Sequence, residues 1–164
     1  MINQKAMFSL THGMYIIGAK DEDRFVGSCV DAIMQGAIKP MLLNLSCLNN
    51  GYTQSIIKKT GMVSISVLGK KVEPSMISTF GFQSSRNVNK WDGLDMIEKD
   101  NLPFLNNSIS HLTCKVIKND IYESHSIFTL EVLKAEMINE NDEPLTYTDY
   151  QNYFKNEVIK GLQK

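Results

Sequence analysis

The chain of 164 residues is long enough to bury most of its apolar surface in one core, so we expect a single domain over residues 1–164. With 43% hydrophobic and 21% charged residues, its composition excludes an intrinsically disordered protein. Seventeen basic and eighteen acidic residues leave a formal net charge of −1, and no basic stripe indicates a nucleic-acid partner. The sequence shows neither a signal-peptide pattern nor an apolar run long enough to span a membrane, and we therefore expect a cytoplasmic protein.

The three cysteines lie in apolar runs typical of strands, at Cys29, Cys47 and Cys114. Their spacing contains no C-x-x-C and matches no zinc or rubredoxin-type cluster. An odd number of cysteines without a recognisable secretion signal favours reduced, buried thiols. We therefore expect no metal site.

The chain is predicted to begin with a hairpin. A strand over residues 13–20 turns back into a second strand over residues 25–35. Polar side chains interrupt the apolar run of this second strand at Ser28, Asp31 and Gln35.

A third strand leads into a candidate phosphate-binding loop. The run over residues 41–48 is apolar on both faces, as in a fully covered strand. The polar loop 49–53 and a helix over 54–60 follow, with Thr53 as the expected N-cap and Gly61 after the last turn. A polar loop at a helix N-terminus offers free N–H groups and a partial positive charge, which suit a phosphate. Many capped helices with this pattern bind nothing, so both interpretations stay open.

The next strand, residues 62–68, alternates apolar and polar residues, and we expect it to be half-buried with Ser64 and Ser66 on the other face. A short helix is predicted over residues 74–81. The irregular stretch over residues 82–100 is either a binding loop or an exposed polar connection. It gathers the donors that an anionic ligand needs: Ser84, Ser85, Arg86 and Lys90.

Two more strands and a helix complete the chain. The strands are predicted over residues 110–118 and 126–137, with a turn at residues 119–120, and the alternation places His111 on the surface. The last helix begins at Thr146 with a motif that resembles a capping box. It carries an apolar stripe that packs on the parent domain, forms a subunit contact or covers a ligand: Tyr147, Tyr150, Phe154 and Val158.

These elements indicate a mainly β fold, an antiparallel barrel with peripheral helices. The sequence contains neither a G-x-G-x-x-G after a strand nor a G-K-[ST], which excludes a Rossmann crevice and a P-loop. None of the three histidines has a metal-ligand spacing, and no nucleophile-elbow pattern surrounds a serine. His125 lies where a strand begins at the barrel rim, a position that suits either a ligand contact or a backbone contact. The residues alone thus indicate a candidate phosphate site without visible acid–base or metal chemistry.

The same segments, in the same order, resemble the flavin reductase-like family of FMN-binding split barrels. The resemblance extends over almost the whole chain and is strongest to the flavoprotein domain of high-molecular-weight rubredoxins and to flavoredoxin. The segments that carry it are SLTHGMYIIGAK, GSCVDAIMQGAIKP, YTQSIIKKTGMVSISVL, FGFQSSRNVNKW, LTCKV, HSIFTLEV and EPLTYTDYQ. It implies a split β-barrel of Greek-key type and a homodimer with FMN near the subunit interface.

The resemblance also implies positions for the cofactor. The isoalloxazine ring is expected beside Val30, Asp31, Ala32 and Gln35. The FMN phosphate and its loop are expected beside Asn50, Thr53, Ser84, Arg86 and Lys90. Near the reacting face, the resemblance places His125, with Tyr147 and Tyr150 packed close by.

Several positions depart from the family pattern, among them Asp31, Ala32, the loop residues 50–52 and Leu130. Asp31 stands where relatives commonly have Asn, and Ala32 where Thr or Ser is usual, so one hydroxyl contact is lost. An ionised carboxylate at Asp31 would disfavour the anionic reduced flavin and lower its potential. The chain also ends without the four cysteines of an appended rubredoxin, so any rubredoxin partner is expected to be a separate protein.

We therefore expect an FMN-containing oxidoreductase that passes electrons from NADH or NADPH through flavin to an acceptor such as rubredoxin, free flavin or oxygen. His125 is the expected catalytic residue. Two alternatives stay open. One is an FMN electron-transfer protein without its own hydride donor, and the other is a split barrel that binds a different ligand or only dimerises.

Overall fold

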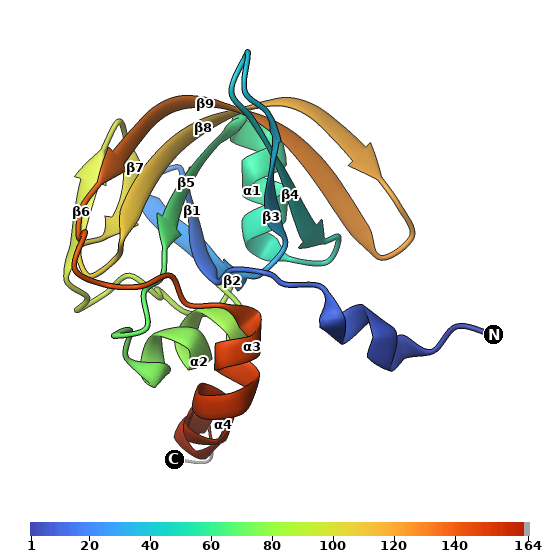
Figure 1. The fold of residues 1–164 in the computed structure, drawn as a ribbon. Coiled ribbons are helices and arrows are strands. Elements are labelled where there is room, and N and C mark those ends of the chain that lie inside the picture. Colours follow the sequence, from blue (N-terminus) through green and yellow to red (C-terminus); the bar gives the residue numbers. More distant parts are fainter. Residues whose placement is uncertain (163–164) are drawn as a thin grey trace.

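The computed structural model describes residues 1–162 (Figure 1). One large sheet contains β1 (Tyr15–Asp21), β2 (Arg24–Val30), β3 (Ile33–Ala37), β4 (Leu42–Leu48), β5 (Met62–Val67), β8 (Ser110–Ile121) and β9 (His125–Met137). A separate hairpin consists of β6 (Met96–Lys99) and β7 (Leu102–Leu105). The helices are η1 (Gln4–Ser9), α1 (Tyr52–Thr60), α2 (Pro74–Phe82), α3 (Tyr147–Asp149), the π-helical η2 (Tyr150–Phe154) and α4 (Lys155–Leu162).

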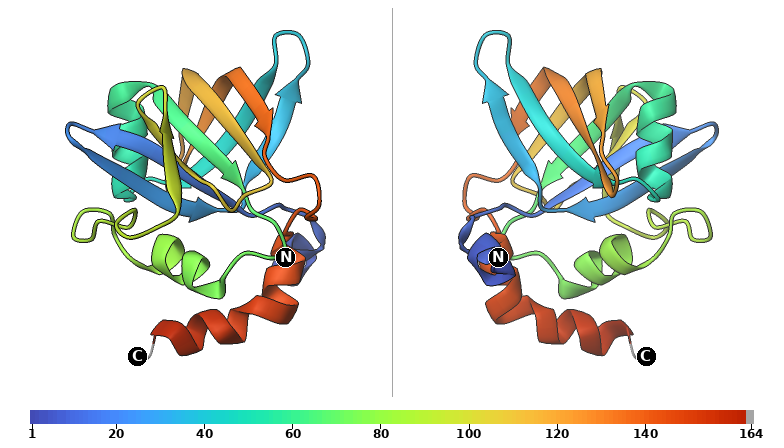
Figure 2. Two further views of the ribbon diagram at one scale, coloured as in Figure 1. Left: turned by 90° about the vertical axis from the view of Figure 1, so that its left-hand side faces the viewer. Right: turned by 90° about the vertical axis from the view of Figure 1, so that its right-hand side faces the viewer.

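The large sheet has the order β2-β1-β5-β8-β9-β4-β3, and each neighbouring pair is antiparallel. It curls around α1, while α2 and α4 lie together below one end of the barrel (Figures 1 and 2). The expected mainly β split barrel with peripheral helices is therefore confirmed.

The split in the barrel lies between its two edge strands, β2 and β3, which are consecutive along the chain. The single strand predicted over residues 25–35 is wrong because β2 pairs with β1, whereas β3 pairs with β4 at the other edge. The chain crosses from one edge to the other at Asp31 and Ala32. Across this crossing, the backbone N–H of Ser46 donates to the carbonyl oxygen of Ala32 at 2.9 Å.

Two apolar cores hold the elements together. The first fills the space between α1 and the concave face of the sheet, where Ile57, Ile65 and Phe128 are fully buried. The second joins the sheet to α2 and α4 and contains Phe80 and Val158. Burial of each such side chain contributes about 1.5–3 kcal/mol, so the two cores fix α1 and α2 relative to the barrel.

The outer face of β5 is covered, contrary to the half-buried strand predicted there. The hydroxyl of Ser64 donates to the carbonyl oxygen of Pro103 at 2.6 Å, and that of Ser66 accepts from the N–H of Leu105 at 3.1 Å. The β6–β7 hairpin thereby packs against β5 through polar contacts. It also buries His111, which the alternation of β8 had placed on the surface.

Two further predictions concern the turn between β8 and β9 and the start of the last helix. The turn predicted at residues 119–120 is wrong, since both residues pair with β9 and the chain reverses only after Ile121. The capping box is confirmed: the Thr146 hydroxyl accepts from the N–H of Asp149 at 3.0 Å, and the Asp149 carboxylate accepts from the N–H of Thr146 at 3.1 Å. The aromatic stripe that follows packs against the second core. Of the three interpretations of this stripe, packing on the parent domain is therefore the one that the structure shows.

Among the described helices, none combines the length and apolar character needed to cross a membrane.

Candidate functional site

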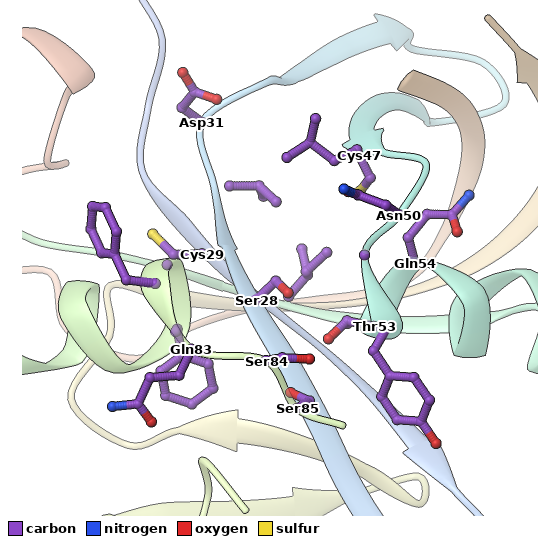
Figure 3. Close-up of a pocket in the computed structure, with 18 of the residues that line it drawn as sticks. Ser28, Cys29, Asp31, Cys47, Asn50, Thr53, Gln54, Gln83, Ser84 and Ser85 are labelled. Carbon is purple, nitrogen blue, oxygen red and sulfur yellow. The ribbon is translucent and has the colours of Figure 1, made fainter. Parts of the chain in front are cut away.

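A cavity of about 430 Å³ opens at the split of the barrel (Figure 3). Its walls come from the ends of β2 and β4, the first turn of α1, the end of α2 with the loop that follows, and the first residue of β9. The polar side chains that line it are Ser28, Asp31, Ser46, Asn50, Tyr52, Thr53, Gln54, Gln83, Ser84, Ser85 and His125. A cavity of this size with a few convergent polar groups is typical of a small-molecule site.

Thr53 lines this cavity and has an unpaired hydroxyl. The helix begins two residues earlier than predicted, with Gly51 at the N-cap position, so Thr53 is part of the first turn rather than the cap. Its side chain is 2% exposed, and its Oγ1 has no hydrogen-bond partner among the described residues. Leaving a buried hydroxyl unpaired costs about 1–3 kcal/mol, which a ligand oxygen at this position would offset.

The first turn of α1 adds further donors at the same place. Gly51 provides no side-chain acceptor, so the first backbone N–H groups of the helix are not capped by a side chain. The positive end of the helix dipole lies there as well. In Figure 3, Thr53 and Ser84 project toward one another from opposite walls. This end of the cavity therefore suits an anionic group such as a phosphate.

The loop after α2 is fixed to β2 through one residue. The Ser85 hydroxyl accepts from the N–H of Gly27 at 3.0 Å and donates to its carbonyl oxygen at 2.9 Å. The ammonium of Lys90 donates to the same carbonyl at 3.0 Å and to that of Phe80 at 3.0 Å. A Cβ on Gly27 would lie 2.7 Å from the Phe80 ring, so glycine is needed for this close approach.

The structure thereby corrects the role expected of Lys90. Its side chain is 3% exposed, does not line the cavity and is bound to backbone carbonyls instead of facing a phosphate. Burial lowers the pKa of Lys90 to about 8. Lys90 thus holds β2, the end of α2 and the loop together from behind the wall.

Arg86 lies at the rim beside Tyr52. Its guanidinium is 4.7 Å from the centre of the Tyr52 ring, and the Tyr52 hydroxyl donates to Asp21 at 2.6 Å. No carboxylate lies within 4.0 Å of Arg86 among the described residues. Although Arg86 itself does not line the cavity, its charge is therefore available to an anion at this end.

The opposite end contains the residues expected near the ring. Val30 and Asp31 line both the main cavity and a smaller one of about 260 Å³ next to it. Tyr147 and Tyr150 line only the smaller cavity, with ring centres 5.7 Å apart. Burial raises the pKa of Tyr150, with smaller contributions from Tyr147 and Cys29.

Ala32 and Gln35 do not line either cavity, unlike their neighbours. Ala32 contributes its carbonyl to the pairing with Ser46, and Gln35 is exposed on β3. Ala32 lies in the crossing between β2 and β3, and Gln35 lies on β3. The structure thus does not bring them together with the other residues expected at the ring.

His125 and Asn50 do line the main cavity, at the end of β4 and the start of β9. The Nδ1 atom of His125 lies 2.8 Å from the Ser124 hydroxyl. Behind it, Gln54 donates to the Ser126 hydroxyl at 3.1 Å, which donates to Asn49 at 2.7 Å. This hydrogen-bonded network connects α1 to β9 and fixes the rim around His125.

Lining residues that were not predicted from the sequence include Cys29, Cys47, Gln54 and Gln83. Gln54 follows Thr53, and the spacing of Thr53 to Ile56 and Ile57 on one helix face would have shown that this turn is buried. All three cysteines are free, but Cys29 remains partly exposed on the wall, contrary to the expected burial. Loss of hydration at the wall, together with the charge of Asp31, raises the pKa of Cys29 to about 12, although Lys90 acts in the opposite direction. Within residues 1–162, no group of three or more histidine, cysteine or carboxylate side chains is arranged to hold a metal ion.

Comparison with known proteins relates this site to one family. The model of the flavin reductase-like domain matches residues 7–155. The chain is 32% identical over 151 residues to the high molecular weight rubredoxin of Moorella thermoacetica, an alignment that covers 91% of this chain and 66% of that protein, just under two thirds of its length. It is 28% identical over 149 residues to the ferric-chelate reductase (NAD(P)H) of Archaeoglobus fulgidus, covering 89% of this chain and 87% of that protein.

A solved structure shows the same fold. The NADH:FAD oxidoreductase SgcE6 of Streptomyces globisporus superimposes with a TM-score of 0.80 at 15% identity, over 87% of this chain and 85% of that chain. The family match covers both walls of the cavity, from Ser28 to Ser85, and the start of β9 at His125. The chain therefore belongs to the flavin reductase-like family of oxidoreductases.

Proposed function

We propose that the cavity at the split of the barrel binds FMN and that the protein is an NAD(P)H-dependent flavin oxidoreductase. A bound flavin would accept a hydride from the reduced nicotinamide and pass electrons on singly or in pairs. The protein then needs to bind the cofactor, orient it and limit its contact with water. This division of roles agrees with a cavity that lacks a metal-binding cluster among the described residues.

The unpaired hydroxyl of Thr53 is the observation that carries the proposal. It lies in the first turn of α1, facing the Ser84 hydroxyl of the opposite wall (Figure 3). A phosphate placed between them would accept from both hydroxyls and from the free backbone N–H groups of the helix. Arg86 at the rim would add an opposite charge.

The remainder of the cavity fits the ring of a flavin. Its walls include the side chains of Val30 and Leu48 and the thiol of Cys29, while Asn50 provides an amide. Apolar walls with a few hydrogen-bonding groups fix the orientation of a planar ligand and reduce its exposure to water. The residues present therefore fit FMN, with its phosphate at the Thr53 end and its ring toward Asp31.

His125 is proposed to contact the reacting end of the ligand. It lines the cavity at the rim, and the Ser124 hydroxyl beside Nδ1 restrains the orientation of its ring. Tyr147 and Tyr150 in the adjoining cavity are proposed to lie near the nicotinamide side. This assignment separates FMN binding at one end from the approach of the hydride donor at the other.

We also propose that two copies of the chain associate. The helix η1 has no buried residue, and its apolar side chains Met7 and Phe8 are 57% and 68% exposed. On the β3–β4 hairpin, Met34 and Ile38 are 64% and 79% exposed. Such apolar surfaces at the open side of a barrel suit a second copy.

The proposed electron acceptors are a rubredoxin-like carrier, free flavin or oxygen. The Moorella relative is itself named a rubredoxin, and about one third of its length lies outside the alignment. A carrier of the rubredoxin type is therefore a proposed electron-transfer partner of this chain.

An anaerobic absorption spectrum tests the proposal. The purified protein, incubated with FMN and freed of excess by gel filtration, is expected to be yellow and to bleach on addition of NADH or NADPH. Mass spectrometry of the released cofactor distinguishes FMN from FAD. Bleaching by dithionite but not by either nicotinamide would favour the electron-transfer alternative, and a colourless protein would contradict flavin binding.

A further inference from the structure

Asp31 occupies the point where the chain crosses the split between β2 and β3. It lines the main cavity and the smaller one beside it. Its backbone carbonyl accepts from the N–H of Ile33 at 3.2 Å, but its carboxylate forms no ion pair or hydrogen bond with any described residue. Figure 3 shows it at the end of the cavity away from Ser84 and Ser85.

Nearby groups respond to the charge of this carboxylate. Burial raises the pKa of Tyr15, and Asp31 raises it further. Asp31 has the same effect on the Cys29 thiol, again after the larger effect of burial. In both cases a neighbouring group becomes harder to convert to an anion, as expected near an unpaired negative charge.

The cations of the site do not neutralise Asp31. The Lys90 ammonium is bound to the carbonyls of Gly27 and Phe80, and it lowers the pKa of Cys29 without forming a contact to Asp31. Arg86 stacks on Tyr52 at the phosphate end of the cavity. The ring end of the cavity therefore carries one uncompensated negative charge among the described residues.

We propose that Asp31 lowers the reduction potential of the flavin held in this cavity. The inference rests on the proposed function and adds to it the control of the electron-transfer energy. Hydride transfer brings two electrons and one proton, so it adds one negative charge to the ring unless a second proton follows. The carboxylate opposes that added charge wherever in the cavity the ring lies, and the sign of its effect therefore does not depend on the orientation of the ligand.

The carboxylate thereby makes the reduced flavin a stronger reductant for its acceptor. A unit charge acting over about 10 Å at an effective dielectric constant of about 20 changes an equilibrium constant on the order of tenfold. For a two-electron couple, a tenfold change corresponds to about 30 mV. The potential and the affinities for the two redox forms are linked, so the effect is measurable as a ratio of dissociation constants.

The variant Asp31→Asn tests the inference because it removes the charge and keeps the shape of the side chain. Dissociation constants for oxidised FMN and for dithionite-reduced FMN are measured anaerobically by titration, and the midpoint potential is measured with a reference dye. We expect Asp31→Asn to favour the reduced form about tenfold relative to the wild type and to raise the potential accordingly. Asp31→Glu, which keeps the charge, should retain a ratio close to that of the wild type.

Glu140→Gln is a matched control, since it removes one carboxylate from an exposed position that lines neither cavity. It should leave the ratio unchanged. An unchanged ratio in Asp31→Asn, with FMN still bound, would overturn the role of Asp31 and leave the proposed function standing. Failure of the wild type to bind either form would overturn the proposed function, and the inference with it.

Discussion

The unpaired hydroxyl of Thr53 leads to a prediction in which stability and ligand binding change in opposite directions. Thr53→Val replaces the hydroxyl with a methyl group and keeps the branched shape and a similar helix propensity. Because Oγ1 has no partner among the described residues, the substitution removes the cost of burying it. We expect the FMN-free protein to become more stable by about 1 kcal/mol, which raises its Tm by about 2–4 °C.

Binding should weaken at the same time. A hydrogen bond to a charged group contributes about 1.5–3 kcal/mol, so the dissociation constant for FMN should increase by about 10- to 150-fold. Riboflavin, which lacks the phosphate, should bind the variant and the wild type alike. Thermal unfolding without ligand and fluorescence titration with both flavins measure the two effects separately.

Thr60 offers a matched control in the same helix. Its hydroxyl donates to the carbonyl oxygen of Ile56 at 3.0 Å and is therefore satisfied. Thr60→Val should not stabilise the protein and should not change FMN binding. If Thr53→Val lowers the Tm, the hydroxyl has a partner in the folded protein, and if FMN binds equally well, the phosphate lies elsewhere.

Four further predictions concern basic side chains: Arg86, Lys90 and His125 at or behind the cavity, and His111 beneath the β6–β7 hairpin. Arg86→Ala should weaken FMN binding roughly tenfold through loss of an opposite charge. Arg24→Ala should have little effect, because the Arg24 guanidinium is already paired with the Asp21 carboxylate at 3.6 Å. Equal changes of the dissociation constant in the two variants would contradict this prediction. Burial lowers the pKa of Lys90 to about 8, so the unfolded state binds more protons than the folded state between about pH 8 and 10.5. The free energy of unfolding should therefore rise across this pH window in the wild type but not in Lys90→Met. Burial likewise lowers the pKa of His111 below 6.5, so denaturant unfolding should show stability falling as the pH drops below 6.5, and a His111→Gln variant should lack this loss. His125→Ala should slow anaerobic bleaching by NADH in stopped flow while the dissociation constant for FMN changes little; an unchanged rate would remove His125 from the reacting end.

The architecture of the barrel was largely predictable because its strands have clear periodicity. The strand over residues 41–48 and the helix ending at Gly61 were recovered within a residue or two, and Gly61 adopts the left-handed conformation, φ 71°, that a glycine after a helix permits. The break at Asp31 was not visible, since nothing in an apolar run shows that its two halves pair with different edges of a sheet. That information lies in the pairing of β3 with β4, which is a contact between distant parts of the structure.

The polar faces of strands were misjudged for a related reason. Ser66 and His111 alternate with apolar residues, and alternation normally indicates a solvated face. The β6–β7 hairpin covers this face, and the Nε2 atom of His111 donates to the carbonyl oxygen of Leu105 at 2.8 Å. The other ring nitrogen, Nδ1, must then be the acceptor, because the Lys99 ammonium that faces it at 3.4 Å can only donate. Sequence patterns report which residues are polar, but they do not report which of them will find a partner.

The candidate site was predicted in outline through the resemblance, and the structure separates its members by their contacts. Thr53, Ser84 and His125 do line the cavity, whereas Lys90 lies behind its wall. Ala32 and Gln35 line neither cavity. Spacing along the chain could not make this distinction, because the loop that carries Lys90 folds back on Gly27 through contacts that no local pattern specifies.

Hydrogen-bond satisfaction therefore distinguishes the structural polar residues of this protein from those available to a ligand. Ser66, Ser85 and Lys90 are all buried and polar, yet each is bound to backbone groups of a neighbouring element and so holds the barrel, the hairpin and the loop together. Thr53 is equally buried but has no partner, and the Asp31 carboxylate has none either. Among the described residues, Trp91 Nε1 and Asn119 Oδ1 are also buried without a partner, but neither residue lines the cavity. Thr53 and the half-buried Asp31 do line it, at the split of the barrel, and their unpaired groups are therefore available to a ligand held there.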